Sequence, residues 1–179
     1  MPEMETIDLD RLVYEGAVKL EITRGVPTWE AYPSIIHQET IDLIRASIEP
    51  GIGGATECGC FHYSDIYIQF MDGSIKRPDI SIFCQRPPRQ EESLTTIPQT
   101  VIEIISPGYK FKDLALNPPF YQAQNMEDVV IVDPRTGAVS HFSLRSDTVE
   151  YQAPVTLTLQ CGYRCTIPAP LPLEGGAGA

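Results

Sequence analysis

Two short β-branched runs, each carrying a single acidic residue, stand out in the hydrophobic pattern of the chain. They cover residues 75–85 and 100–106. In both runs apolar residues recur with the period of two that is typical of a β-strand. In the first run Asp79 falls on the face opposite two isoleucines, and in the second Glu103 shares a face with a valine and an isoleucine. The pattern therefore predicts two strands with one carboxylate each.

A carboxylate within an apolar strand is costly to bury unless it is paired, hydrogen-bonded or bound to a metal. Asp79 and Glu103 lie on strands that are close in sequence, and carboxylate oxygens are the ligands that hard divalent cations prefer. Together they predict a site for a divalent cation. The alternative is that each acid lies on a solvated face or at a frayed strand end, as single strand acids often do.

A helix is predicted over residues 34–47, with Ser34 as its N-cap and a stop before Pro50. His37 lies on the apolar stripe of this helix, which also carries Ile41, Ile44 and Ile48. A lone inward histidine is more often a hydrogen-bonded core residue than part of a site. Both interpretations of His37 stay open at this point.

The remaining pattern predicts one further helix and several strands. The second helix is expected to begin near Asn117, as its cap, and to end by Asn125. Loops are expected at 25–33 and 85–96, and a hairpin turn at 71–74. The other expected elements are a helical turn at 9–14, strands at 17–23, 55–63, 65–70 and 128–134, and a terminal antiparallel meander at 139–144, 148–152 and 155–159.

Composition narrows the class of protein. The net charge of −11 argues against a broad basic surface for non-specific nucleic-acid binding, although it leaves room for a local or metal-neutralised site. No apolar run is long enough to span a membrane, and the acidic N-terminus does not resemble a secretory signal. We expect a cytoplasmic protein with one domain over residues 1–167 and a flexible tail at 168–179.

The sequence contains five cysteines. Without an export signal, reduced thiols that pack as small hydrophobes are expected. Cys58, Cys60, Cys161 and Cys165 could alternatively supply four thiolates to a zinc ion. Their spacing is not that of a usual zinc knuckle, so the first interpretation is favoured.

The order of elements resembles the PD-(D/E)XK nuclease superfamily, and more closely the Uma-two family of restriction-endonuclease-like proteins. The residues that carry the resemblance lie between Leu12 and Pro134. They are His37-Gln38, Pro78-Asp79, Glu103 with Ser106-Pro107, Asp113 and Tyr121, and the run 129–134. The resemblance implies an α+β fold of the restriction-endonuclease-like type. It would have a central mixed sheet flanked by two helices, extra N-terminal strands and the C-terminal meander.

The resemblance also implies metal-dependent hydrolysis of DNA phosphodiester bonds. Asp79 and Glu103, with the backbone carbonyl of Ile104, would hold Mg²⁺ or Mn²⁺. His37 would lie at the rim, as a ligand or as a group that orients the nucleophile. Nucleases that cut both strands often work as dimers, and an edge strand of the meander could pair two copies into a homodimer.

The chain departs from the pattern where a lysine is expected to stabilise the transition state. The superfamily position two residues after Glu103 is Ile105, and the Uma-two position on the second helix is Asn117. Lys110 or Lys112 from the preceding loop could supply the charge instead. Lys76 and Arg77 are further candidates. The alternative function is therefore a nuclease-fold protein without efficient catalysis that serves as a binding or interaction module, and a third is a β-rich protein with only architectural similarity.

Overall fold

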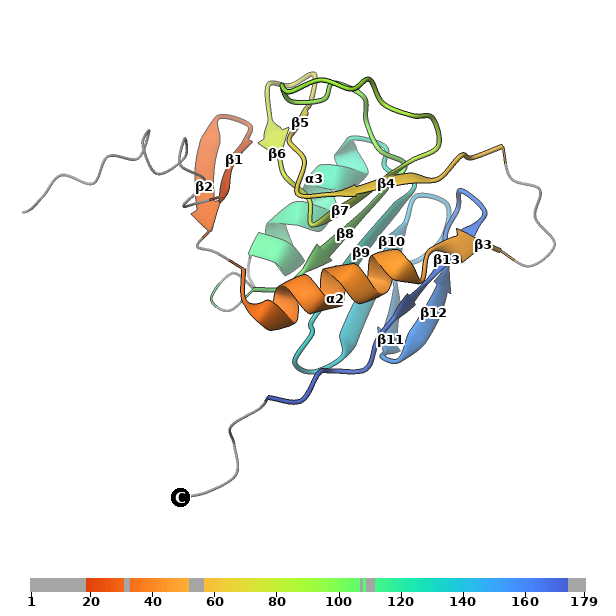
Figure 1. Ribbon diagram of the computed structural model, residues 1–179. Coiled ribbons are helices and arrows are strands. Elements are labelled where there is room, and N and C mark those ends of the chain that lie inside the picture. The colour runs from red at the N-terminus through yellow and green to blue at the C-terminus, as the bar shows by residue number, and fades with distance from the viewer. Residues whose placement is uncertain (1–18, 31–32, 52–56, 107, 109–111, 174–179) are drawn as a thin grey trace, which may run out of the picture.

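A computed structural model describes residues 19–30, 33–51, 57–106, 108 and 112–173. Figure 1 shows the arrangement of the elements. The helices are α2 (Ile35–Ala46), the π-helical turn η1 (Lys112–Leu116) and α3 (Asn117–Ala123). The strands are β1 (Lys19–Thr23), β2 (Val26–Glu30), β3 (Glu49–Pro50), β4 (Phe61–Ser64), β5 (Ile68–Gln69), β6 (Ile75–Lys76), β7 (Ile80–Phe83), β8 (Thr100–Ile104), β9 (Asp128–Val132), β10 (Ala138–Ser143), β11 (Val149–Gln152), β12 (Val155–Thr158) and β13 (Tyr163–Ile167).

A mixed sheet of six strands forms the centre of the fold. Its strand order is β11-β10-β9-β8-β7-β4. Only β8 and β9 run parallel within this sheet, and their connection contains α3, as a parallel crossover requires a long link. The predicted α+β architecture, a central mixed sheet with two flanking helices, is confirmed.

The two faces of this sheet are buried in different cores. Ile80 and Ile102 point to one face, where they pack with α2 and with the small sheet β12-β13-β3. Phe83 and Val101 point to the other face, where they pack with aromatic residues of α3. By the period of two, Asp79 and Glu103 belong to this second face. The fold therefore brings both acids to the side covered by α3.

Helix α2 forms as the pattern predicts. The Ser34 hydroxyl accepts a hydrogen bond from the His37 N–H at 3.3 Å, so Ser34 is the N-cap. Ile41 and Ile44 are almost fully buried. His37 is buried with them, only 5% exposed, as its place on the apolar stripe indicated.

The predicted strand at 75–85 is divided between two sheets. Residues 75–76 form β6 of a four-stranded sheet with the order β2-β1-β6-β5, whereas residues 80–83 form β7 of the central sheet. Pro78 lies between them and has no N–H to donate to a strand neighbour. The break thus carries the chain from one sheet to the other just before Asp79.

Three further expectations about elements are wrong. The expected loop at 25–33 contains β2, because Arg24 and Gly25 take positive φ values of 49° and 83° and turn the chain back along β1. The expected meander is not continuous: β12 leaves the central sheet and pairs with β13, which the pattern did not predict. Asn117 is not a cap but the first residue of α3, after Leu116. The helical turn expected at 9–14 lies outside the described residues.

The expectation of reduced thiols is also wrong for two cysteines. Cys58 and Cys84 form a disulfide. The segment before β4 continues alongside the end of β7, where the Gly59 N–H donates to the Cys84 carbonyl at 2.7 Å. This proximity of two segments that are distant in sequence creates the pair.

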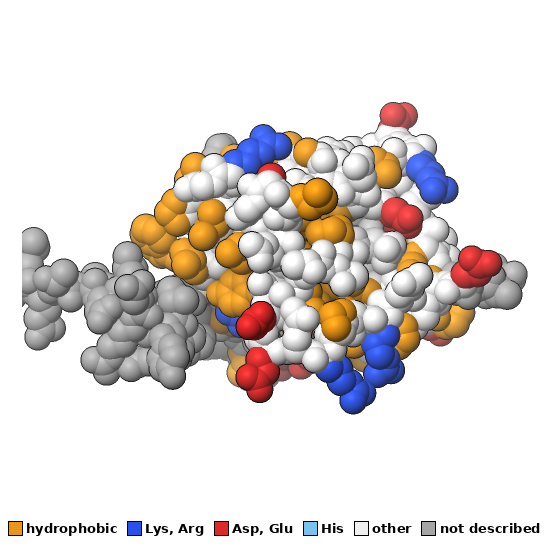
Figure 2. Space-filling view, turned by 90° about the horizontal axis from the view of Figure 1, so that it is seen from above, with side chains coloured by type: hydrophobic (Ala, Val, Ile, Leu, Met, Phe, Trp, Pro, Cys, Tyr) orange, Lys and Arg blue, Asp and Glu red, His pale blue; other side chains and the backbone are white. Residues whose placement is uncertain are grey.

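On the face drawn in Figure 2, Lys and Arg side chains of the described residues lie in a few separate groups and form no continuous basic patch. Over the ranges that the structure describes, no helix has the length and apolar character needed to cross a membrane.

Candidate active site

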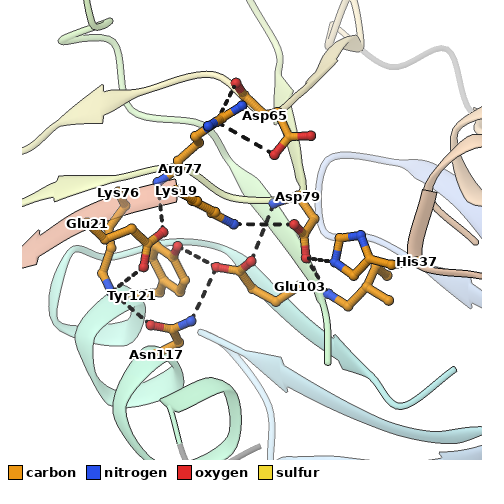
Figure 3. Close-up of polar contacts among 11 residues, drawn as sticks. Lys19, Glu21, His37, Asp65, Lys76, Arg77, Asp79, Glu103, Asn117 and Tyr121 are labelled. Carbon is orange, nitrogen blue, oxygen red and sulfur yellow. Dashed lines mark hydrogen bonds and ion pairs between the residues drawn. The ribbon is translucent and has the colours of Figure 1, made fainter. Parts of the chain in front are cut away.

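Asp79 and Glu103 converge, as the sequence predicts (Figure 3). Asp79 immediately precedes β7, and the neighbouring Ile80 pairs with Ile102 of β8. The Asp79 N–H donates to Glu103 Oε2 at 3.3 Å, and the Ile104 N–H donates to Asp79 Oδ2 at 2.7 Å. Each carboxylate therefore accepts a hydrogen bond from the backbone of the other strand. Both residues are buried, with exposed fractions of 4% and 2%.

Two basic side chains contact the Asp79 carboxylate. Lys19 Nζ of β1 lies 3.3 Å from Oδ1, and His37 Nε2 of α2 lies 3.2 Å from Oδ2. Burial by itself would raise the pKa of Asp79, but Lys19 and His37 outweigh it and hold this pKa well below the usual value. Asp79 is therefore ionised at neutral pH.

The same contacts shift the two bases in the opposite direction. Burial lowers the pKa of Lys19, yet the negative charges of Asp79 and Glu103 overcome this effect and raise it. Burial likewise opposes protonation of His37, while its hydrogen bond to Asp79 raises its pKa above the ordinary value. Lys19 is accordingly a permanent cation, and the site also favours the imidazolium form of His37.

Side chains of α3 fix Glu103. The Tyr121 hydroxyl donates to Glu103 Oε1 at 2.7 Å, and the Asn117 amide donates to the same oxygen at 3.4 Å. Burial and the nearby carboxylate raise the pKa of Tyr121 well above its usual value, so the hydroxyl keeps its proton. The helix thus holds one oxygen of the acid in place with two neutral donors.

A second lysine, Lys76, is separated from Glu103 by the side chain of Asn117. Lys76 is 1% exposed, and its ammonium donates to Asn117 Oδ1 at 2.8 Å and to Glu21 Oε2 at 3.3 Å. It also lies 5.2 Å from the centre of the Phe120 ring, within the range of a cation–π contact. The other Glu21 oxygen accepts the Arg77 N–H at 2.9 Å. Lys76 is connected to Glu103 through the Asn117 amide.

Arg77 and Asp65 form an outer pair. Arg77 Nε lies 3.7 Å from Asp65 Oδ1 and donates to the Asp65 carbonyl at 3.1 Å. Burial, and then the charge of Asp79, raise the pKa of Asp65. In Figure 3 this pair lies beside Lys19, on the side away from Asn117.

The remaining residues of the predicted site are Ile104, Ile105, Lys110 and Lys112. Ile104 contributes its backbone N–H to Asp79. Ile105 packs in the second core, so it supplies no charge, as the sequence indicated. Lys110 lies outside the described residues. Lys112 begins η1, and its side chain also lies outside the described structure.

Sequence reasoning missed the lysine that contacts Asp79. Lys19 and Glu21 occupy the polar face of β1, which reads as the solvated side of an ordinary amphipathic strand. In the structure Glu21 is 1% exposed, because this face turns toward the two acids. No local signal separates such a strand from a surface strand. A charge-bearing strand close to a suspected site is the only hint that the pattern offers.

The central mixed sheet with a helix on either face is a restriction-endonuclease-like fold. The chain belongs to the Uma2 family, described as "putative restriction endonuclease", whose profile matches residues 8–168. A crystal structure from Anabaena variabilis, described as a "putative nuclease belonging to DUF820", is similar with a TM-score of 0.54 and 19% identity. The alignment covers 85% of this chain and 88% of that one, and at this identity the likeness is one of fold. No curated protein matches the chain.

Proposed function

We propose that the protein is a metal-dependent endonuclease that hydrolyses phosphodiester bonds of DNA. The observation that carries this proposal is the convergence of Asp79 and Glu103 beside the Lys19 ammonium. Two carboxylates with a cation beside them are the groups that this hydrolysis needs. Membership of the Uma2 family supports the class of reaction.

The donor set suits a hard divalent cation. Asp79, Glu103 and the Ile104 carbonyl would hold Mg²⁺ or Mn²⁺, with His37 next to them. Lys19 already contacts Asp79, so a cation at this carboxylate would share it with the ammonium or displace it. A bound divalent cation supplies a water of lowered pKa and neutralises charge that builds on the phosphate.

The side chains of the protein have distinct roles in this proposal. Lys19 stabilises the negative charge on the phosphate oxygens in the transition state, the role for which neither Ile105 nor Asn117 is suited. Tyr121 and Asn117 keep Glu103 in position. His37 positions Asp79 through their hydrogen bond. Because the exposed Lys and Arg residues of Figure 2 are scattered, DNA binding would depend on contacts near the site.

The test is cleavage of supercoiled and single-stranded DNA in the presence of Mg²⁺ or Mn²⁺. We expect wild-type protein to cut and Glu103→Ala to lose at least about a hundredfold in rate, because an acid that holds the cation is gone. Asp147→Ala is the matched control, since this acid is exposed and lies in the turn before β11. Equal cleavage by wild type and Glu103→Ala would contradict the proposal. Addition of EDTA, which removes the divalent cation, should stop the reaction.

A second candidate function is DNA or protein binding without cleavage. The burial of Asp79 and its direct pairing with Lys19 favour it, because a satisfied ion pair can be purely structural. It predicts that the protein retards DNA in a mobility-shift assay while every tested cation fails to support cleavage. Metal-supported cleavage that depends on Glu103 would exclude this candidate.

We also propose that the protein is cytoplasmic and acts as a homodimer. Strand β11 is exposed along its length and forms one edge of the central sheet, so it offers backbone groups to a second copy. Light scattering during gel filtration should give twice the monomer mass. Tyr151→Lys on β11 should shift the protein to a monomer, and an unchanged mass would contradict pairing through this edge.

A further inference from the structure

All five cysteines of the chain contribute to one region of the molecule. Three of them belong to the first core, between the central sheet and the sheet β12-β13-β3, and two pack against it. The sulfur atoms of Cys58, Cys84 and Cys161 all lie within 4.8 Å of one another. Cys60 and Cys165 carry thiols beside them. These residues come from three separate segments of the chain, so the cluster is a product of the fold.

Two glycines, Gly59 and Gly162, shape the backbone next to the cysteine cluster. A side chain at Gly59 would meet the Phe61 ring at 2.6 Å and the Cys84 carbonyl at 3.1 Å, so only glycine fits between Cys58 and Cys60. On the other side, Gly162 has a φ of +85°, which turns the chain between Cys161 and β13.

In that turn the Tyr163 N–H forms a hydrogen bond with the Cys161 sulfur. Backbone donors of this kind stabilise the thiolate form of a cysteine, which is the form that binds metals.

The thiols outside the disulfide are poor nucleophiles as they stand. Burial raises the pKa of Cys60 and of Cys165 to about 12, and the neighbouring Cys161 adds to both shifts. Burial also raises the pKa of Cys161, and the charges of Asp128 and Glu127 act in the same direction. Several sulfurs that would repel one another as anions are thus collected in one place. A soft cation would remove this repulsion and let the thiols ionise.

We propose that Cys58, Cys84 and Cys161 bind one Zn²⁺ ion as thiolates when the Cys58–Cys84 disulfide is reduced, with Cys60 or Cys165 as the fourth ligand. Tetrahedral zinc with bonds of about 2.3 Å places its sulfur ligands about 3.8 Å apart. The Cys161 sulfur lies within 4.8 Å of both sulfurs of the Cys58–Cys84 disulfide, and reduction of this bond would free those two sulfurs to move apart around the ion. The site is separate from Asp79 and Glu103, which face the other side of the central sheet, so it goes beyond the proposed nuclease activity.

Zinc binding requires only an external dithiol as the reductant of the Cys58–Cys84 disulfide. A small dithiol gives two electrons and two protons to the Cys58–Cys84 disulfide and becomes a cyclic disulfide itself. Zinc then binds, and each coordinating thiol releases its proton to solvent. Reoxidation of the two cysteines by a disulfide or a peroxide would remove two of the ligands and release the metal.

The test uses Co²⁺ as a spectroscopic substitute for Zn²⁺. The full chain is reduced with dithiothreitol, freed of it without oxygen, and titrated with Co²⁺. We expect a thiolate-to-cobalt charge-transfer band that saturates at one ion per chain and disappears when Zn²⁺ is added. The oxidised protein should not give the band. A reduced wild-type protein without the band would overturn the proposal.

Single substitutions then identify the ligands. Cys161→Ser should weaken Co²⁺ binding at least tenfold, and one of Cys60→Ser and Cys165→Ser should do the same, whereas Asp147→Asn at an exposed position should leave the band unchanged. A band unaffected by Cys161→Ser, or by both of the other cysteine variants, would contradict the assignment. Because a variant could fail to fold, native mass spectrometry of wild type provides a second measurement. One zinc per reduced chain, with the thiols protected from alkylation, is expected, and zinc-free chains would refute the site.

Discussion

At the scale of single residues, the site depends on the groups that balance the negative charge of the buried Asp79 carboxylate. Its carboxylate accepts hydrogen bonds from Lys19, His37 and the Ile104 backbone, each within 3.3 Å. A buried ion pair adds little stability compared with an apolar pair, yet removing only one partner is costly, since the other charge stays buried. The two members of the pair should therefore respond differently to substitution.

Asp79→Asn should lower the free energy of unfolding by about 3 kcal/mol, because it leaves Lys19 and His37 without their shared anion. Lys19→Met should cost less, since Asp79 keeps His37 and the Ile104 N–H. Urea titration at neutral pH measures both values, and Asp147→Asn serves as the exposed control. A larger loss for Lys19→Met than for Asp79→Asn would show that Asp79 is not the centre of this network.

The His37–Asp79 contact should give stability that depends on pH. The folded-state pKa of His37 is raised above the usual 6.5, so its contribution is complete below that value and is lost as pH rises through the folded-state pKa. Asp79 stays ionised throughout, because its own pKa is lowered.

The difference in stability between wild type and His37→Gln should therefore shrink on going from about pH 5.5 to about pH 9. Urea unfolding at several pH values measures it. A difference that is constant over this range would contradict the assignment of a charged His37.

At the scale of elements, three separate pieces supply the site to the central strands. Strand β1 provides Lys19, α2 provides His37, and α3 provides Asn117 and Tyr121. The family pattern expects a lysine at position 117, and here the asparagine amide accepts from Lys76 of β6 instead. The positive charge is thus supplied from a strand of the four-stranded sheet, and the helix supplies only a neutral link to Glu103.

Asn117→Lys should destabilise the protein by about 3 kcal/mol, because it places a second ammonium next to the buried Lys76. Adding Lys76→Asn in the same chain should recover most of the loss, since one lysine then remains near Glu103 and Glu21. Unfolding of the two single variants and the double variant gives the coupling. Additive effects would show that the two side chains do not share one site.

At the scale of the whole molecule, two cores lie on opposite faces of the central sheet and differ in the chemically reactive side chains that they contain. The face covered by α3 carries the acids, whereas the face covered by α2 and β13 carries the cysteines. The disulfide joins residues 26 positions apart at the end of β7. It therefore constrains an edge of the central sheet, without touching the candidate active site.

Reduction of this disulfide should lower the free energy of unfolding by about 3 kcal/mol in metal-free buffer, because the unfolded chain regains the freedom of the closed loop. Urea unfolding of oxidised and reduced protein, both with EDTA, measures the change. The Cys58→Ser variant should match the reduced protein and should not respond to dithiothreitol. Equal stability of the two wild-type forms would contradict a structural role for the bond.

The sequence alone determined the parts that depend on local periodicity. Helix α2 with its Ser34 cap, strand β8 with Glu103, strand β7 directly after Asp79, and the common face of the two acids all follow from side-chain spacing and capping chemistry. Local geometry repeats every two or 3.6 residues, so such features can be read along the chain.

Only the tertiary structure decided which distant groups meet these elements. The polar face of β1 turns inward to place Lys19 at Asp79, the chain changes sheets at Pro78, and Cys58 meets Cys84 and Cys161. Each of these contacts joins segments that no short-range pattern relates, and each is stabilised by burial that exists only after the sheets have packed. The acids could be found from sequence because they interrupt apolar strands, while their lysine could not, because it lies on a strand of ordinary polar alternation.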